Sequence, residues 1–259
     1  MIKIRITRVD RENDNTPILS NDEIDKYAHD VLQDYKPYLL REPGAVPFEH
    51  FLESYLGLEL KFKDIYNEDP KNPIWGRTVF HDTLVKIFDR ENECIKNMPV
   101  RANTVILDNY LMGAGFEGMR LFTSLHEGAH FLLHSGVTSI RQAGQMCCRR
   151  KNVENLKGLP QTPEQWREHH ANRFASSFSM PDSTFIPFVN QFMREQGVFK
   201  GCIILGQDDD LNILAENLLP ESIAEIYGVS KSAALIKLKK SGFVATGIGN
   251  MKYNNHYYI

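Results

Sequence analysis

The sequence has few cysteines and no long apolar run. Its four cysteines, Cys94, Cys147, Cys148 and Cys202, show no CxxC spacing, which excludes a zinc ribbon and a thioredoxin-like redox motif. We interpret the adjacent Cys147 and Cys148 as reduced thiols. The chain lacks a run of about 18 apolar residues, and residues 1–6 alternate charged and apolar side chains instead of forming a secretory signal. We therefore expect a cytoplasmic protein without a membrane partner.

The sequence also lacks an excess of charge of either sign. Lys and Arg number 30 and Asp and Glu number 33, so the net charge is −3 with histidine neutral. This balance gives no general attraction to nucleic acids or acidic membranes. Apolar residues make up 42% and charged residues 24% of the 259 positions. Such a composition and length are typical of a globular enzyme with a sizeable core.

The most informative segment is His126-Glu127-Gly128-Ala129-His130, an HExxH signature inside an apolar run. On a helix, residues four apart lie about 40° around the axis and about 6 Å along it, so both imidazoles can reach one metal ion. Zn²⁺ accepts this arrangement and keeps one coordination position open in catalytic sites. Glu127 lies on the adjacent face, where a general base is needed. A polar set within an apolar helix is costly to bury unless something satisfies it, which favours metal binding over two ordinary surface histidines.

A catalytic zinc ion needs a third protein ligand. The continuation HExxHxxGxxH of the metzincins requires glycine and histidine where this chain has Leu133 and Gly136, which excludes that class. A second helix is predicted to begin after Thr162, with Pro163 at its first position. Three residues on it carry suitable ligand atoms: Glu168, His169 and His170. Spacing alone does not choose among the three.

Two segments resemble the motifs of the ImmA/IrrE metallopeptidase family. Residues 122–134 are similar to that family's active-site helix. The second motif is matched by Glu168, Ala171, Asn172, Phe174 and Ala175, and ends at Met180-Pro181. The likeness covers residues 45–241 and is strongest over 121–181. It implies that Glu168 is the third zinc ligand. This chain departs from the family at His170, and the stretch Ser139–Gln161 is similar to an insertion.

The resemblance implies a zinc-dependent endopeptidase. Zn²⁺ would polarise the peptide carbonyl and lower the pKa of a water molecule. Glu127 would accept a proton from the attacking water and deliver one to the departing amine. The resemblance also implies that the substrate is a specific protein partner, namely a helix–turn–helix transcriptional repressor.

Four residues are candidates for orienting the ligands or stabilising the oxyanion: Asn172, His169, His170 and Tyr110. For each of them a surface role is the alternative. His134 lies about 12 Å along the helix axis from His126, too far to share the same ion. We expect it to pack or to form a hydrogen bond near the end of the helix.

The order of the predicted elements favours an α+β fold. Residues 2–9 alternate like a strand, and Asp10–Thr16 is predicted to be a loop. Ser20–Glu23 is typical of a capping box, here opening a helix to about Leu40, and another helix runs from Pro47 to Tyr55. Further short strands are predicted at Leu58–Ile65, Ile74–Phe80, Leu84–Phe88 and Thr104–Leu107, followed by helices from Gly118 to Ser241.

This order suits the zincin architecture, in which a small, mostly antiparallel sheet packs against a helical bundle that carries the metal site. We expect extra helices at the C-terminal end. Proteases of this type bind the substrate as an added strand at a sheet edge. Thr104–Leu107 and Leu84–Phe88 are the candidates for that edge, although both could be core strands instead.

We predict three parts: an N-terminal region over residues 1–57, a metallopeptidase core over 58–181 and a helical region over 182–259. Within the last part, residues 221–241 resemble a helix–turn–helix unit, with a turn at Gly228 and Ser230 capping the second helix. That helix carries Lys231, Lys237, Lys239 and Lys240, which we interpret as a solvated face. The alternative function is a non-catalytic regulatory protein that binds a repressor or DNA through these helices.

Overall fold

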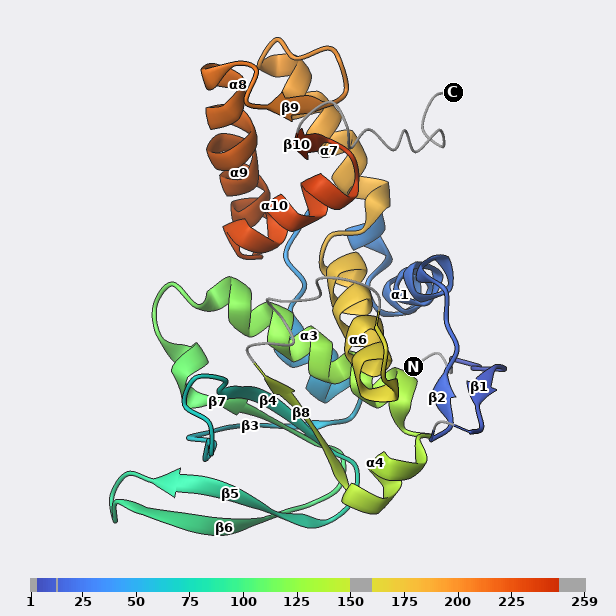
Figure 1. Ribbon diagram of the computed structural model, residues 1–259, viewed down its shortest axis with the longest axis vertical. Coiled ribbons are helices and arrows are strands. Elements are labelled where there is room, and N and C mark those ends of the chain that lie inside the picture. Colours follow the sequence, from blue (N-terminus) through green and yellow to red (C-terminus); the bar gives the residue numbers. More distant parts are fainter. Residues whose placement is uncertain (1–3, 13, 150–159, 247–259) are drawn as a thin grey trace.

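A four-stranded mixed sheet is the base on which the helices of the chain pack. The computed structural model describes residues 4–12, 14–149 and 160–246 (Figure 1). The strands are β3 (Glu59–Lys63), β4 (Ile74–Val79), β7 (Thr104–Asp108) and β8 (Gln145–Arg149), in the order β3-β7-β4-β8. β3 pairs with β7 in parallel, whereas β4 pairs with both β7 and β8 in antiparallel orientation. The α+β, zincin-like fold class is thus confirmed.

One helix packs over one face of this sheet and a second helix packs against the first, and these two helices carry the predicted metal motifs. α3 (Glu117–His134) contacts β4, β7 and β8, and α6 (Pro163–Ser179) lies against α3 (Figure 1). The apolar residues between these elements belong to the largest core cluster, which includes Val105, Leu125 and Phe174. That cluster also includes residues of the N- and C-terminal parts, so one core is shared by all three predicted parts. The three-part division of the chain remains a prediction.

The N-terminal part differs from the expected strand followed by one long helix. Residues 4–8 form no strand, and β1 (Val9–Asp10) instead pairs with β2 (Thr16–Pro17) at the two ends of the predicted loop. The capping box is confirmed, since Ser20 and Glu23 each bind the other's backbone N–H at the start of α1 (Asn21–Tyr35). The predicted end at Leu40 was wrong. Pro37 disfavours helix at the residue before it, so a separate 3₁₀ turn follows (Pro37–Leu40).

The second predicted helix is present and continues directly into irregular helical turns. α2 (Phe48–His50) leads into a π-helical turn (Phe51–Tyr55), and both are followed by β3 as expected. Phe51 and Leu52 are fully buried there, against the face of α3 that carries Gly128.

A β-ribbon covers the other face of the sheet. β5 (Thr83–Asp89) pairs with β6 (Cys94–Val100) along their full length, and β6 was not predicted. Val85 and Val100 pack against Ile106 of the sheet in a second core cluster. Neither candidate for the substrate edge is an edge of the main sheet, because β7 lies between β3 and β4 and β5 belongs to the ribbon.

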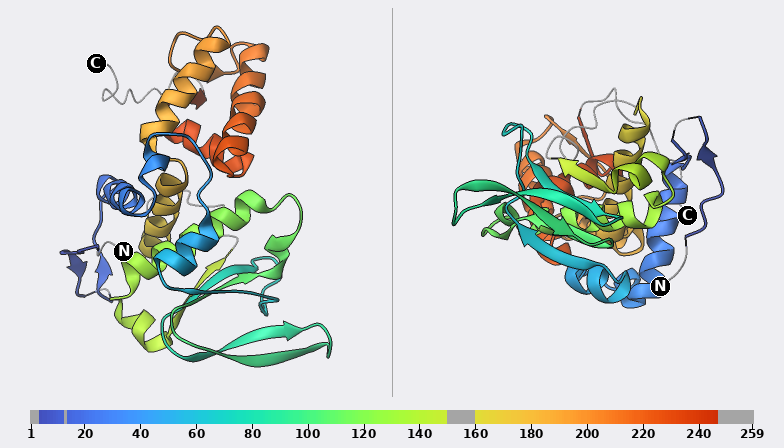
Figure 2. Two further views of the ribbon diagram at one scale, coloured as in Figure 1. Left: turned by 180° about the vertical axis from the view of Figure 1, so that it is seen from behind. Right: turned by 90° about the horizontal axis from the view of Figure 1, so that it is seen from below.

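The helices that follow α6 form a separate layer above α3 (Figure 2). They are α7 (Asp182–Glu195), α8 (Asp209–Ile213), the π-helical turn Leu214–Leu218, α9 (Leu219–Tyr227) and α10 (Lys231–Lys240). A short parallel pair, β9 (Ile203–Leu205) with β10 (Val244–Thr246), was not predicted. Of the predicted helical region over 182–259, residues 247–259 lie outside the described residues.

The helix–turn–helix pattern is present, but one of its lysines does not face solvent. Gly228 adopts a left-handed conformation with φ 66°, and Ser230 caps α10 through the backbone N–H of Ala233. Lys237 is only 7% exposed, and its Nζ lies 2.6 Å from Asp182 Oδ1 at the start of α7. The interpretation of four solvated lysines was therefore wrong for Lys237. The cause is tertiary, since α7 provides an acid opposite this position.

Candidate metal centre and active site

The HExxH residues lie on the buried face of α3. His126, Glu127 and His130 all have 0% exposure. The helical spacing places His126 Nε2 and His130 Nε2 2.8 Å apart. Two nitrogen ligands of a tetrahedral zinc ion are separated by about 3.3 Å, so the pair is already close to the spacing that one ion requires.

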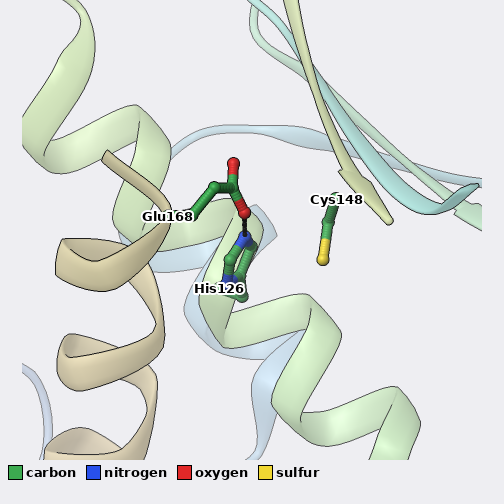
Figure 3. Close-up of side chains that lie close together, drawn as sticks. All are labelled: His126, Cys148 and Glu168. Carbon is green, nitrogen blue, oxygen red and sulfur yellow. Dashed lines mark ion pairs between the residues drawn. The ribbon is translucent and has the colours of Figure 1, made fainter. Parts of the chain in front are cut away.

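Glu168 approaches this pair from the neighbouring helix. α6 begins with a capping box between Thr162 and Gln165. The sequence predicted the start after Thr162 but not the part played by Gln165. Glu168 follows in the second turn of the helix. Its Oε2 lies 3.3 Å from His126 Nε2 and its Oε1 lies 3.4 Å from His130 Nε2. The carboxylate thus faces both imidazoles, and Figure 3 shows its approach to His126.

The two rival ligands on α6 point elsewhere. His169 Nε2 lies 2.8 Å from Asn21 Oδ1 at the start of α1. His170 Nδ1 lies 3.4 Å from His134 Nε2, one turn beyond the HExxH motif. Among the three candidates that the sequence left open, the structure therefore brings Glu168 to the histidine pair.

Each imidazole of the HExxH pair is held through its second nitrogen. His126 Nδ1 lies 2.9 Å from Asn172 Oδ1, and His130 Nδ1 lies 2.9 Å from His134 Nδ1. A partner of this kind selects the tautomer and the orientation of a ligating histidine. Asn172 therefore lies where the sequence suggested an orienting role, and His134 forms the hydrogen bond that we expected of it.

Glu127 lies between α3 and β4, on the sheet side of the helix. Thr78 Oγ1 donates a hydrogen bond to Glu127 Oε2 at 2.5 Å, while Oε1 has no hydrogen-bond partner. The strand can approach this closely only because residue 76 is glycine. A Cβ atom there would lie 2.5 Å from Glu127 Oε1. Burial raises the pKa of Glu127 to about 7, which suits a general base that works near neutral pH.

The sequence analysis missed one member of the cluster, Cys148 on β8. Its thiol is fully buried, and a ligand atom from each of Cys148, His126 and Glu168 lies within 4.8 Å of the others (Figure 3). Burial raises the pKa of the Cys148 thiol to about 11. The sequence offered little indication that Cys148 belongs to this cluster. Its strand falls inside the stretch that resembled an insertion, and its cysteines show no CxxC spacing.

The buried ionisable groups of the cluster shift one another's pKa values. Burial opposes the charge of Glu168, but the adjacent His130 and His126 more than compensate and hold the pKa of Glu168 well below its usual value. Burial likewise opposes a charge on His126, yet Cys148 and Glu168 raise the pKa of His126 well above its usual value. A negative carboxylate buried against imidazoles gains the most from a positive partner.

The residues present fit a divalent metal ion. Two imidazole nitrogens and a carboxylate are a donor set that zinc accepts in catalytic sites. Glu168 Oε2 and Glu127 Oε1 are buried without a hydrogen-bond partner, and such atoms need a ligand or water. The cluster is thus compatible with a metal ion, and zinc remains our prediction for its identity.

Tyr110 lies in the 3₁₀ turn (Asn109–Met112) between β7 and α3. The residue is 55% exposed, and its ring centroid lies 4.5 Å from that of Phe116. Its role as an oxyanion donor remains a prediction, as do those of His169 and His170.

Comparison with known proteins gave one family. A peptidase family model described as the IrrE N-terminal-like domain matches residues 116–239, from the start of α3 almost to the end of α10. A search of curated proteins found no match. Within the described residues, none of the helices has the length and apolarity needed to cross a membrane.

Proposed function

Because residues 116–239 belong to the IrrE N-terminal-like peptidase family, a family of metallopeptidases, we propose that the chain is a zinc-dependent endopeptidase. One observation carries the proposal. His126, His130 and Glu168 converge from two helices, and Glu127 lies beside them with one free carboxylate oxygen. A site that served structure alone would need no carboxylate in that position.

The proposed mechanism assigns separate tasks to the buried residues. His126, His130 and Glu168 would hold the ion, and Asn172 and His134 would keep the two imidazoles in the ligating orientation. A bound zinc ion supplies Lewis-acid polarisation of the scissile carbonyl and makes a water molecule more acidic.

Glu127 would perform the proton transfers. It would accept a proton from the attacking water and deliver a proton to the amine that leaves when the peptide bond breaks. Thr78 keeps one carboxylate oxygen fixed through its hydroxyl, which leaves the other oxygen for the proton transfer. Its pKa of about 7 allows it to accept and release a proton at neutral pH.

The substrate would bind as an extended peptide at the edge of the sheet beside the cluster. Among the described strands of this sheet, β8 has β4 as its one partner, and Cys148 of β8 lies next to His126. A free strand edge binds a peptide through main-chain hydrogen bonds. We propose β8 in place of the two strands that the sequence suggested.

The proposed substrate is a specific protein, a helix–turn–helix repressor, and the proposed location is the cytoplasm. Both follow from the family resemblance. The alternative, a non-catalytic protein that binds DNA through α10, has less support. Lys237 is used in an ion pair with Asp182, and Lys231 pairs with Glu221 at 2.7 Å. Each pairing reduces the positive charge that α10 could offer to phosphate groups.

The proposal is tested by replacing Glu127. The zinc-loaded chain and its Glu127→Gln variant are incubated with a library of proteome-derived peptides, and the products are identified by mass spectrometry. We expect the variant to bind one zinc ion per chain but to cleave at least about 100-fold more slowly, the scale of a lost general base. Glu117→Gln, at the exposed start of the same helix, is the matched control and should cleave normally. Cleavage by the Glu127 variant at the normal rate would remove this residue from the mechanism.

A further inference from the structure

Cys148 contributes a buried thiol beside His126 and Glu168 that the proposed mechanism does not use. Its sulfur lies within 4.8 Å of one ligand atom each of His126 and Glu168, and all three residues are buried. The thiol reaches the cluster from the sheet, whereas Glu168 reaches it from α6 (Figure 3). Donor atoms on different sides of one point are what a tetrahedral ion requires.

The pairing of β8 with β4 holds Cys148 in this position. Cys148 is paired with Gly76, the residue whose missing side chain makes room for Glu127. Side chains alternate along a strand, so Cys147 points to the opposite face. Cys147 indeed packs on the second core cluster, beneath the sheet. The orientation of Cys148 is thus determined by the register of the strand.

The surroundings of Cys148 are those of a ligand. A thiol used as a small apolar filler would be expected among apolar side chains. Cys148 instead lies beside an imidazole and a carboxylate whose Oε2 atom is buried without a hydrogen-bond partner. Thiolate, imidazole and carboxylate together form a donor set that zinc binds readily.

We propose that Cys148 is a fourth protein ligand of the metal ion and that the resting site is therefore closed. This inference rests on the proposed function, since it assumes that His126, His130 and Glu168 bind zinc. Structural zinc sites have four protein ligands, whereas catalytic sites keep one position open. Hydrolysis would then require Cys148 to leave the ion, which makes the thiol an inhibitory ligand.

The coordination step is a simple exchange. On metal binding, the Cys148 S–H bond loses its proton to the solvent and a sulfur–zinc bond forms. On activation, that bond breaks, the sulfur regains a proton from the solvent, and the vacated position becomes available to substrate. No oxidant or reductant is needed in either direction.

The test measures the ligands directly, in the full-length zinc-loaded protein. X-ray absorption at the zinc edge should show one sulfur neighbour at about 2.3 Å beside nitrogen and oxygen neighbours at about 2.0–2.1 Å. The cobalt-substituted protein should show a thiolate-to-cobalt charge-transfer band in the near ultraviolet. Cys148→Ala should lose both signals, and the matched variant Cys147→Ala should keep them.

Two further readouts separate an inhibitory ligand from a merely structural thiol. Zinc affinity, measured by competition with a chelator, should fall by about tenfold or more in Cys148→Ala, the scale of losing a supporting group at a metal site. Peptide cleavage by that variant, with zinc in excess, should be faster than that of the unaltered chain. Cys148→Ser is the second variant, used if the alanine variant does not fold.

The outcomes distinguish this inference from the proposed function. Zinc bound one per chain with only nitrogen and oxygen neighbours would overturn the role of Cys148 and leave the peptidase proposal intact. Slower cleavage by both Cys148 variants with zinc bound would overturn the inhibitory role. Failure of the unaltered chain to bind zinc at all would remove both proposals.

Discussion

Glu127 depends on two neighbours for its position, and both lie on β4. Thr78 supplies a hydroxyl that binds one carboxylate oxygen, and Gly76 supplies the space that the carboxylate occupies. Neither residue belongs to the HExxH motif, yet each acts on the glutamate of that motif. The chemistry of the motif is therefore adjusted by a strand that precedes it by about fifty positions in the sequence, Thr78 and Glu127 being 49 apart.

The first prediction concerns the Thr78 hydroxyl. Its hydrogen bond favours the charged carboxylate and lowers the pKa of Glu127, which burial has raised. Thr78→Val removes that bond, so the pKa of Glu127 should rise further. The base acts in its deprotonated form, and the ascending limb of kcat/KM against pH should therefore move to higher pH by about one unit.

Thr104→Val is the control for this experiment. Thr104 is equally buried but donates to the carbonyl of Arg101, away from Glu127. Its pH profile should match that of the unaltered chain. A Thr78 variant whose ascending limb stays in place, or moves to lower pH, would contradict the assignment of that limb to Glu127.

At the scale of secondary structure, the site lies between α3 and α6 and takes residues from both helices. α3 supplies His126 and His130, and α6 supplies Glu168 and the orienting Asn172. Helix α6 is itself tied to α1 by an ion pair between Arg173 and Asp25. A bound ion would thus connect α3 and α6 through side chains of both helices.

The second prediction follows from an ion held by residues of both helices. A ligand that binds only the folded chain stabilises it, by about 4 kcal/mol at a thousandfold excess over Kd. For a chain of this size such a gain raises Tm by roughly 10 °C. Thermal unfolding with zinc and with a chelator should show this difference. His126→Ala should abolish it, and His169→Ala should retain it because His169 faces α1. Equal melting temperatures with and without zinc in the unaltered chain would contradict the claim that a bound ion connects α3 and α6.

At the scale of the whole molecule, the C-terminal helices rest on the start of α3. The backbone of Val229 and Ser230, at the turn between α9 and α10, lies against Gly118. A Cβ atom on Gly118 would lie 2.2 Å from Ser230 N, closer than any real contact of this kind. The helix–turn–helix pattern therefore serves, in this fold, to pack against the helix that carries the metal motif.

The third prediction tests this packing. Alanine is preferred over glycine in a helix by about 1 kcal/mol, so Gly118→Ala would stabilise an isolated α3. The clash with Ser230 should outweigh that gain, and we expect a net loss of about 1–3 kcal/mol in the free energy of unfolding. Denaturant unfolding measures it. Gly136→Ala, where a Cβ atom would meet open space, is the control. Unchanged or increased stability of the Gly118 variant would show that the two elements do not touch as described.

Short-range patterns accounted for much of the fold. The capping boxes at Ser20 and Thr162 and the helical spacing of His126 and His130 involve residues three or four positions apart. Their geometry depends on local backbone sterics and hydrogen bonds, so it can be read without knowing the rest of the chain. The same holds for the turn at Gly228, where glycine accepts a left-handed conformation.

Features that depend on partners distant in sequence were decided by the tertiary structure. Glu168, His169 and His170 all carry suitable ligand atoms in the sequence, and the packing of α6 on α3 brings only the first to the histidine pair. β8 and its Cys148 reach the cluster because β8 pairs with β4, and Lys237 is buried because α7 places Asp182 opposite it. Strand pairing and helix packing join segments through contacts that no local periodicity encodes, which is why the residue types were evident from the sequence but their meeting point was not.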